Sequence, residues 1–86
     1  MVSQKVVVKN KTGLHARPAA LFSKLANTCA CEVFVEKDGK KINAKSILGV
    51  LSLAIVTDSE ITIITEGENE TESLGKLVEF INNLEE

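Results

Sequence analysis

The only histidine, the only arginine and the only proline of the chain stand within four positions, as His15, Arg17 and Pro18. An imidazole nitrogen is a nucleophile near neutral pH. A guanidinium presents a planar fork of N–H donors that fits phosphate oxygens. Proline lacks a backbone N–H, a loss that does no harm in the first turn of a helix. These residue types and this spacing predict a histidine that accepts a phosphoryl group at the start of a helix.

The residues around His15 favour that position. Gly13 permits a tight or left-handed bend just before it. A helix is predicted from Ala16 to Asn27, with apolar residues at helical spacing that would face a core: Pro18, Leu21, Phe22 and Leu25. His15 is then at or next to the N-cap, where the first N–H groups and the positive end of the helix dipole favour a phosphate. An ordinary surface or core histidine fits the same pattern, and spacing alone leaves both interpretations open.

Strands are predicted over residues 2–9, 32–37, 40–44 and 60–66, where apolar residues alternate or turn signals bound short runs. Asp38-Gly39 is a strong hairpin signal that sets the register of the second and third strands. With the helices, the order along the chain is strand, helix, strand, strand, helix, strand, helix (βαββαβα). We therefore expect an α+β open-faced sandwich, in which three helices cover one face of a four-stranded antiparallel sheet.

A short apolar segment, residues 46–54, predicts the second helix, with Ser46 as its N-cap. Its apolar residues occupy nearly every side, and so small a domain cannot bury them all. Parts of Ile47, Leu48 and Leu51 are expected to stay exposed, as on a partner surface. A fully buried helix is the alternative, and the pattern favours neither.

The last helix is predicted to begin after Gly67, which ends the fourth strand. Asn69 and Glu72 have the spacing of a capping box. Apolar residues then recur on one helical face at Leu74, Leu77, Val78, Ile81 and Leu84. This pattern predicts an amphipathic helix of about 15 residues.

Composition narrows the classes of function. The 86 residues, 44% hydrophobic and 26% charged, are expected to form a single domain, 1–86. A net charge of −2 and only three aromatic side chains disfavour nucleic-acid binding. No apolar run approaches the roughly 20 residues of a membrane span. The N-terminus lacks the apolar stretch of a signal peptide, so we expect a cytoplasmic protein.

Neither a metal nor a cofactor is expected. Cys29 and Cys31 have no further cysteine or second histidine to join them, whereas zinc takes about four ligands. Their separation is also awkward for a disulfide, so we interpret them as plain thiols. The chain lacks the glycine-rich motifs that hold nucleotides. A phosphoryl group on it must therefore be loaded and removed by other proteins.

Two segments resemble the signature stretches of the histidine-containing phosphocarrier (HPr) family of the bacterial phosphotransferase system. They are residues 11–20 (KTGLHARPAA) and residues 43–53 (NAKSILGVLSL). The expected order of elements agrees with the fold of that family, and the resemblance covers essentially the whole chain.

The resemblance implies a role for each candidate residue. His15 would accept a phosphoryl group at Nδ1 from enzyme I, which phosphoenolpyruvate charges, and pass it to the EIIA domains of sugar permeases. Arg17 would steady the phosphoryl group. Ser46 matches a site that a serine kinase/phosphorylase modifies in many Gram-positive bacteria, giving a form that binds a catabolite repressor. The expected partner-binding surface comprises Thr12, Ala16, Ala20, Ile47, Leu48 and Leu51.

Departures from the family pattern leave a second interpretation open. Leu48 and Leu51 stand where methionine is common, and Ala54 where glycine is common. Several segments also resemble Crh, a regulatory paralogue that carries glutamine in place of the active histidine, and His15 favours the carrier. The alternative is a Crh-like binding module that acts in catabolite repression through phospho-Ser46. An enzyme would need a substrate pocket and a second acid or base near His15, which the local sequence does not supply.

Overall fold

The computed structural model describes residues 1–85, so Glu86, the last residue of the expected domain, lies outside the described residues. In the described part, four strands and three helices follow one another in the predicted order. They are β1 (Val2–Val7), α1 (Ala16–Asn27), β2 (Glu32–Lys37), β3 (Lys40–Asn43), α2 (Ile47–Ser52), β4 (Glu60–Glu66) and α3 (Glu70–Asn82).

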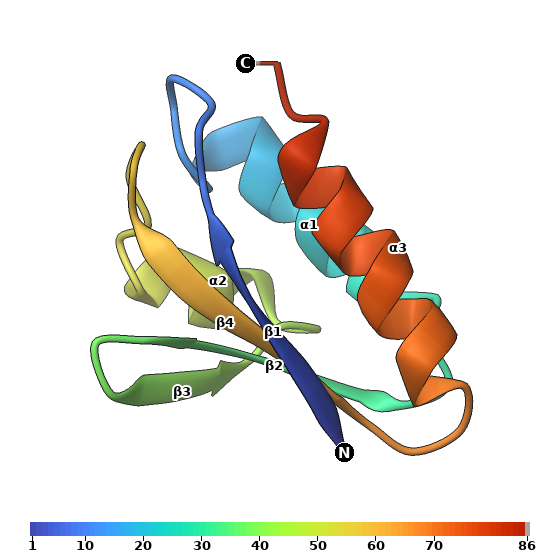
Figure 1. The fold of residues 1–86 in the computed structure, drawn as a ribbon. Coiled ribbons are helices and arrows are strands. Elements are labelled where there is room, and N and C mark those ends of the chain that lie inside the picture. The colour runs from blue at the N-terminus through green and yellow to red at the C-terminus, as the bar shows by residue number, and fades with distance from the viewer. Residues whose placement is uncertain (86) are drawn as a thin grey trace.

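The strands pair antiparallel in the order β1-β4-β2-β3, so the first strand of the chain lies at an edge and the last lies inside the sheet. Asp38 and Gly39 both have positive φ (53° and 83°), as a two-residue type I′ hairpin requires. α1 and α3 lie side by side over one face, and α2 packs between α1 and β3 (Figure 1). The predicted open-faced α+β sandwich is confirmed.

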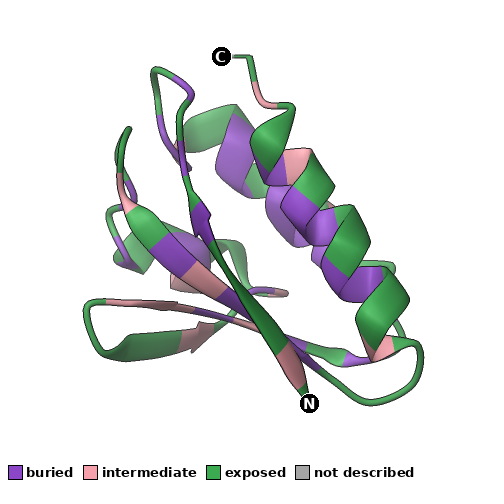
Figure 2. Ribbon diagram, in the orientation of Figure 1, coloured by how far each residue is buried: buried purple, intermediate pink, exposed green. Residues whose placement is uncertain are grey.

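The core lies between the sheet and the helices, where purple buried segments of both layers face each other (Figure 2). Alternation along the strands produces this arrangement, because successive side chains point to opposite faces. The inward side chains include Val6, Val8, Val33, Val35, Ile61 and Ile63. Phe22 from α1 and Leu77 and Ile81 from α3 meet them. The opposite face is largely polar, with Lys41 Nζ 4.6 Å above the Phe34 ring.

One residue of α1 does not face the core as predicted. Leu21 is 39% exposed, because the buried side of α1 consists mainly of small residues. The buried residues of this helix are Pro18, Ala19, Phe22, Ser23 and Ala26. Small side chains let the helix approach the sheet closely, so the alanines rather than the larger leucine mark the buried side.

Three elements end earlier than predicted. β1 ends at Val7, although the chain stays hydrogen-bonded beyond it, because Val8 N–H donates to Ser59 O (2.9 Å). β3 stops at Asn43, whose side chain accepts from Lys45 N–H (2.9 Å) and turns the chain toward α2. α2 ends at Ser52 because Ala54 has a left-handed backbone (φ 50°), which cannot continue a right-handed helix.

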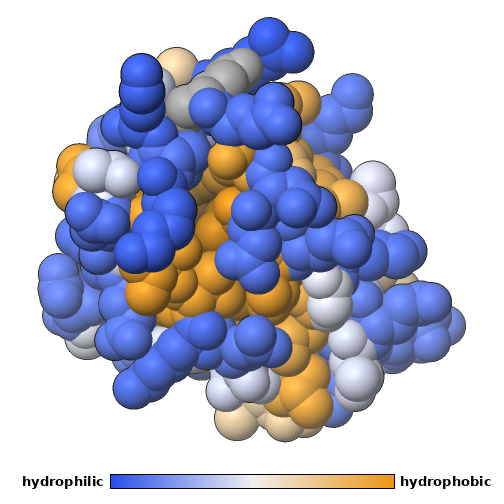
Figure 3. All heavy atoms as spheres, turned by 45° about the horizontal axis from the view of Figure 1, so that its top comes forward, coloured by the Kyte–Doolittle hydropathy of each residue, from blue (hydrophilic) through white to orange (hydrophobic). Residues whose placement is uncertain are grey.

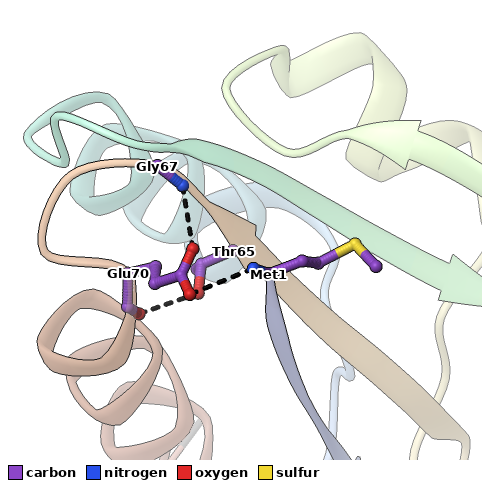
Figure 4. Close-up of polar contacts among 4 residues, drawn as sticks. All are labelled: Met1, Thr65, Gly67 and Glu70. Atoms are coloured by element: carbon purple, nitrogen blue, oxygen red, sulfur yellow. Dashed lines mark hydrogen bonds and ion pairs between the residues drawn. The ribbon is translucent and has the colours of Figure 1, made fainter.

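The predicted capping box at the start of α3 is wrong. Asn69 is the N-cap, but its backbone is left-handed (φ 59°) and its side chain makes no capping hydrogen bond. Glu70 closes this end instead: its carboxylate accepts from Gly67 N–H (3.0 Å) and pairs with the Met1 ammonium (3.0 Å) (Figure 4). Thr65 Oγ1 also donates to Glu70 O (2.8 Å). α3 runs for 13 residues.

The Glu70 contacts predict an acid-sensitive end of the fold. The Gly67 N–H bond, and then the bond to the Met1 ammonium, hold the pKa of the Glu70 carboxyl below its ordinary value. A depressed carboxyl pKa stabilises the fold above the unfolded-state pKa, and that stabilisation is lost as the pH falls through the folded-state pKa. Glu70→Gln should therefore lower Tm at pH 7 and flatten the decline of Tm below about pH 5.

Thermal melts from pH 7 to pH 3 measure this effect. Glu72→Gln is the matched control, since it removes a charge from the same helical turn without touching either bond. Parallel pH profiles for wild type and Glu70→Gln would contradict the role given to this carboxylate.

Candidate functional site

His15 follows a turn that is held from two directions. Gly13 N–H donates to Asn10 O (3.3 Å), and Leu14 N–H donates to Ile55 O (3.0 Å) in the segment after α2. Leu14 has no exposed surface, so the residue before His15 is anchored in the core. A Cβ atom at Gly13 would lie 2.2 Å from Ile55 O, and φ is +63° there. Only glycine fits this close approach of two backbone segments.

His15 is the N-cap of α1, as predicted, with an extended backbone (φ −120°, ψ 158°). Its side chain is half-buried and makes no capping hydrogen bond. Capping therefore does not occupy a ring nitrogen. The first N–H groups of a helix have no intrahelical acceptors and lie at the positive end of its dipole. The imidazole is thus at the end of α1 that favours a phosphate.

Two alanines next to this turn have left-handed backbones. Ala16, directly after His15, has φ 49°, and Ala54, directly before Ile55, has φ 50°. This conformation costs a residue with a Cβ atom about 1–2 kcal/mol. Glycine would adopt it freely. Such backbone strain persists only where surrounding contacts impose it, so the Gly13–Ile55 contact lies between two strained positions.

Arg17 lies exposed in the first turn of α1, two residues after His15. The structure therefore brings the two predicted residues to the same helix end. No acidic side chain occurs in this first turn. A phosphoryl group on His15 would meet no carboxylate there that repels it.

Ser46 is the N-cap of α2, as predicted, and its Oγ accepts from Gly49 N–H (3.1 Å). The preceding turn is tied to the far end of α1, since Asn27 Nδ2 donates to Lys45 O (2.9 Å). A 12-residue helix such as α1 is about 18 Å long. Ser46 and His15 are therefore associated with opposite ends of α1.

The six residues of the expected partner-binding surface are all exposed: Thr12, Ala16, Ala20, Ile47, Leu48 and Leu51. Between the two alternatives for α2, the structure decides for exposure. Leu48 is 78% exposed and Ile47 46%, and Val50 is the buried residue of the helix. Figure 3 shows the face that comes forward when the top of Figure 1 is turned toward the viewer, with hydrophobic residues in its middle and hydrophilic ones around them; it does not identify them as residues of α2.

Sequence reasoning missed two exposed apolar residues of the same elements. Leu21 lies four positions after Arg17 and thus on the same side of α1. Val56, in the loop after α2, is 53% exposed. Apolar periodicity could not reveal Leu21, because it treats every apolar residue on a helix as a candidate for the core, and it does not apply to a loop residue such as Val56.

Charge is a further signal that spacing did not show. Residues 1–31 contain five basic residues and no acidic one, and residues 40–57 contain three basic residues and no acidic one. Both helices of the candidate surface, α1 and α2, lie in these segments. Residues 58–86 contain nine acidic residues and one basic residue. The two segments that contain His15 and Ser46 are therefore basic, and positive charge attracts anionic groups and partners.

The two cysteines are buried free thiols, with Cys29 8% and Cys31 1% exposed. Among residues 1–85, no group of three or more potential metal-ligating side chains comes together. No helix in the described part of the chain combines the length and apolar character needed to cross a membrane.

Known proteins match this chain over most of its length. A family model described as "PTS HPr component phosphorylation site" matches residues 2–83. The HPr-like protein Crh of Bacillus subtilis is 58% identical over 81 residues, which are 94% of this chain and 95% of Crh. The phosphocarrier protein HPr of Borreliella burgdorferi is 34% identical over 86 residues, the whole of both chains. The crystal structure of the phosphocarrier protein HPr of Bacillus anthracis has a TM-score of 0.91 and 52% identity, covering 93% of this chain and 95% of that one.

The approach of Gly13 to Ile55 predicts a large effect of one methyl group. In Gly13→Ala the new Cβ would meet backbone, 2.2 Å from Ile55 O and 2.7 Å from Val56 Cα. Backbone cannot rotate away as a side chain can, so we expect a loss of about 2–5 kcal/mol in the free energy of unfolding. Urea denaturation measures this loss.

Gly39→Ala is the matched control, because Gly39 also has positive φ (83°) but no atom within 4 Å of the new Cβ. It should cost only the conformational strain of about 1–2 kcal/mol. Equal losses in the two variants would mean that the Gly13 contact adds nothing.

Proposed function

Because the chain belongs to the histidine-containing phosphocarrier (HPr) family, whose members carry phosphoryl groups and are not catalytic enzymes, we propose that it is a carrier of the phosphoenolpyruvate-dependent sugar phosphotransferase system. In the cytoplasm His15 accepts the phosphoryl group from enzyme I and passes it to sugar-specific EIIA domains. One observation carries this proposal: the only histidine of the chain is the N-cap of α1, and its ring makes no capping hydrogen bond.

The transfer needs a neutral imidazole and no group beyond the two proteins. The Nδ1 lone pair of His15 attacks phosphorus while the bond from phosphorus to enzyme I breaks, and the electron pair of that bond stays on enzyme I. Nε2 keeps its proton. Transfer to an EIIA domain repeats the step with His15 as the leaving group. The fork of Arg17 and the first N–H groups of α1 balance the charge of the phosphoryl oxygens.

The docking of both protein partners rests on the exposed apolar side chains of α2. Ile47, Leu48 and Leu51 offer an apolar centre, with exposed fractions of 46%, 78% and 36%. α1 and β3, the elements that α2 contacts, both contain basic residues. A partner that combines an apolar patch with acidic side chains fits such a surface, and charge complementarity speeds its association.

Phosphoenolpyruvate-dependent labelling of His15→Ala tests the proposal. Wild type incubated with enzyme I and phosphoenolpyruvate should gain one acid-labile phosphoryl group by intact mass, and the variant should gain none. The fold should persist, since the half-buried His15 side chain makes no capping hydrogen bond and its loss should cost less than about 1 kcal/mol. An acid-labile phosphate on the variant would show that another residue is the acceptor.

A regulatory role through Ser46 is the second candidate. The chain is 58% identical to the HPr-like protein Crh, and Ser46 is an exposed N-cap beside the apolar face of α2. In this role a serine kinase/phosphorylase modifies Ser46, and the phosphorylated form binds a catabolite repressor protein. A phosphate there adds about −1.5 to −2 charge at the favourable end of α2, so the helix keeps its form while the surface changes sign. Partners with acidic groups are then repelled, and partners with Arg or Lys are attracted.

Ser46→Asp separates this switch from ordinary capping, because Asp is an equally good N-cap. We expect an unchanged Tm, slower phosphorylation of His15 by enzyme I, and a stronger dependence of that rate on salt. The control is Ser46→Asn, which caps without adding charge. If Ser46→Asp and Ser46→Asn accept phosphoryl groups at the same rate in low salt, charge at Ser46 does not regulate docking.

A further inference from the structure

Asn10 is a buried polar residue in the turn that leads to His15. Its side chain is 5% exposed, and Nδ2 donates to Gly13 O (2.8 Å) in a bond that is itself buried. A carbonyl oxygen accepts only, so the amide NH₂ group must face it. The same Nδ2 lies 3.4 Å from Thr12 Oγ1. One side-chain nitrogen thus contacts two of the residues between Asn10 and Leu14.

The backbone of Asn10 reinforces this contact. Asn10 O accepts from Gly13 N–H (3.3 Å), so both polar groups of the Gly13 residue are bound to Asn10. With N–H and C=O fixed, the peptide plane between Gly13 and Leu14 has little freedom to rotate. Leu14 N–H, in that same plane, donates to Ile55 O (3.0 Å). The direction in which the chain enters His15 is therefore set by Asn10 on one side and Ile55 on the other.

The residue type at position 10 is informative. An apolar side chain would fill a buried position without the cost of burying an amide, and that cost is offset only where the amide is hydrogen-bonded. A change that removes the Asn10 donor leaves Gly13 O with the longer and weaker bond from Thr12 Oγ1 (3.5 Å). The bond is local and joins residues three apart, so it adds little to the contact between sheet and helices. The hydrogen bond from Asn10 to Gly13 therefore affects mainly the conformation of this turn, which ends at His15.

We propose that Asn10 is a positioning residue for phosphoryl transfer: its amide fixes the Gly13 carbonyl and so holds His15 in place at the start of α1. This inference rests on the proposed function. It assigns Asn10 no contact with the phosphoryl group. A small error in the placement of a reacting group lowers the reaction rate steeply, because the geometry of attack is lost even though the binding contacts remain.

Steady-state phosphorylation by enzyme I, with this protein as the varied substrate, tests the inference. Asn10→Leu and Asn10→Ala both remove the donor, the first at similar volume and the second with no added bulk. Both should lower kcat about tenfold while KM changes less than about twofold, because the exposed apolar side chains of α2 on which docking rests are unchanged. The ¹⁵N resonances of the His15 ring should shift or broaden in both variants.

Thr65→Val is the matched control. Thr65 is also a buried residue whose side chain donates to a backbone carbonyl, that of Glu70 (2.8 Å). It lies beside Met1, at the other end of β1 from the turn that precedes His15 (Figures 1 and 4). This variant should lower Tm to a similar degree and leave both kcat and the His15 resonances unchanged.

The outcomes distinguish a positioning role of Asn10 from a purely structural one. A tenfold fall in kcat for the Asn10 variants alone supports positioning. Unchanged kcat in a folded Asn10 variant overturns it, and so does a fall in kcat that Thr65→Val matches at equal Tm. If neither Asn10 variant folds, Asn10 is required for folding and the inference is also overturned. Wild type that gains no phosphoryl group from enzyme I would instead refute the proposed function itself, which keeps the two failures distinct.

Discussion

The backbone of Gly13 lies against the carbonyl group of Ile55, and the geometry around His15 depends on that contact. Leu14 N–H completes it by donating to the same carbonyl (3.0 Å). The two segments are far apart in the sequence: one leads from β1 into α1, and the other leads from α2 toward β4. Because they are joined through backbone atoms, the start of α1 and the end of α2 are held relative to each other. The proposed transfer through His15 needs this kind of fixed placement.

Burial of Leu14 and Ile55 maintains the contact against backbone strain at two alanines. Leu14 and Ile55 have no exposed surface, so moving either segment away would expose a large side chain at a cost of about 1.5–3 kcal/mol each. That stabilisation exceeds the cost of the left-handed backbones at Ala16 and Ala54. Backbone strain next to a reacting residue persists where packing in the core imposes the local backbone conformation. The site at His15 thus depends on two residues that have no exposed surface.

The two candidate roles use one surface in different ways. His15 begins α1, while the turn before Ser46 is bound to the other end of that helix through Asn27. A phosphate on Ser46 would therefore act on the shared docking surface and not on the imidazole directly. The exposed apolar side chains of α2 follow Ser46 along the chain and would serve either proposed role. The same scaffold is thus compatible with carrier and regulator, and the presence of His15 in this chain favours the carrier.

Sequence alone determined the features that depend on residues a few positions apart. The N-caps at His15 and Ser46, the Asp38-Gly39 hairpin and the alternation of the strands were all predicted and are confirmed, because each is set by local backbone geometry. The order of the elements then left few ways to bury one face of the sheet. Charge segregation between the two parts of the chain was equally present in the sequence, although spacing arguments did not use it.

Only the tertiary structure decided features that depend on distant partners. Leu21 is exposed because the neighbours of α1 select its small-residue side, and no pattern within the helix reveals that choice. The capping box failed because the chain from Gly67 to Glu70 is shaped by Met1 and Thr65 as well as by its own residues. The need for glycine at position 13 is visible only once Ile55 lies against it. In each case the deciding atom belongs to another segment of the chain, and its proximity exists only after the chain has folded.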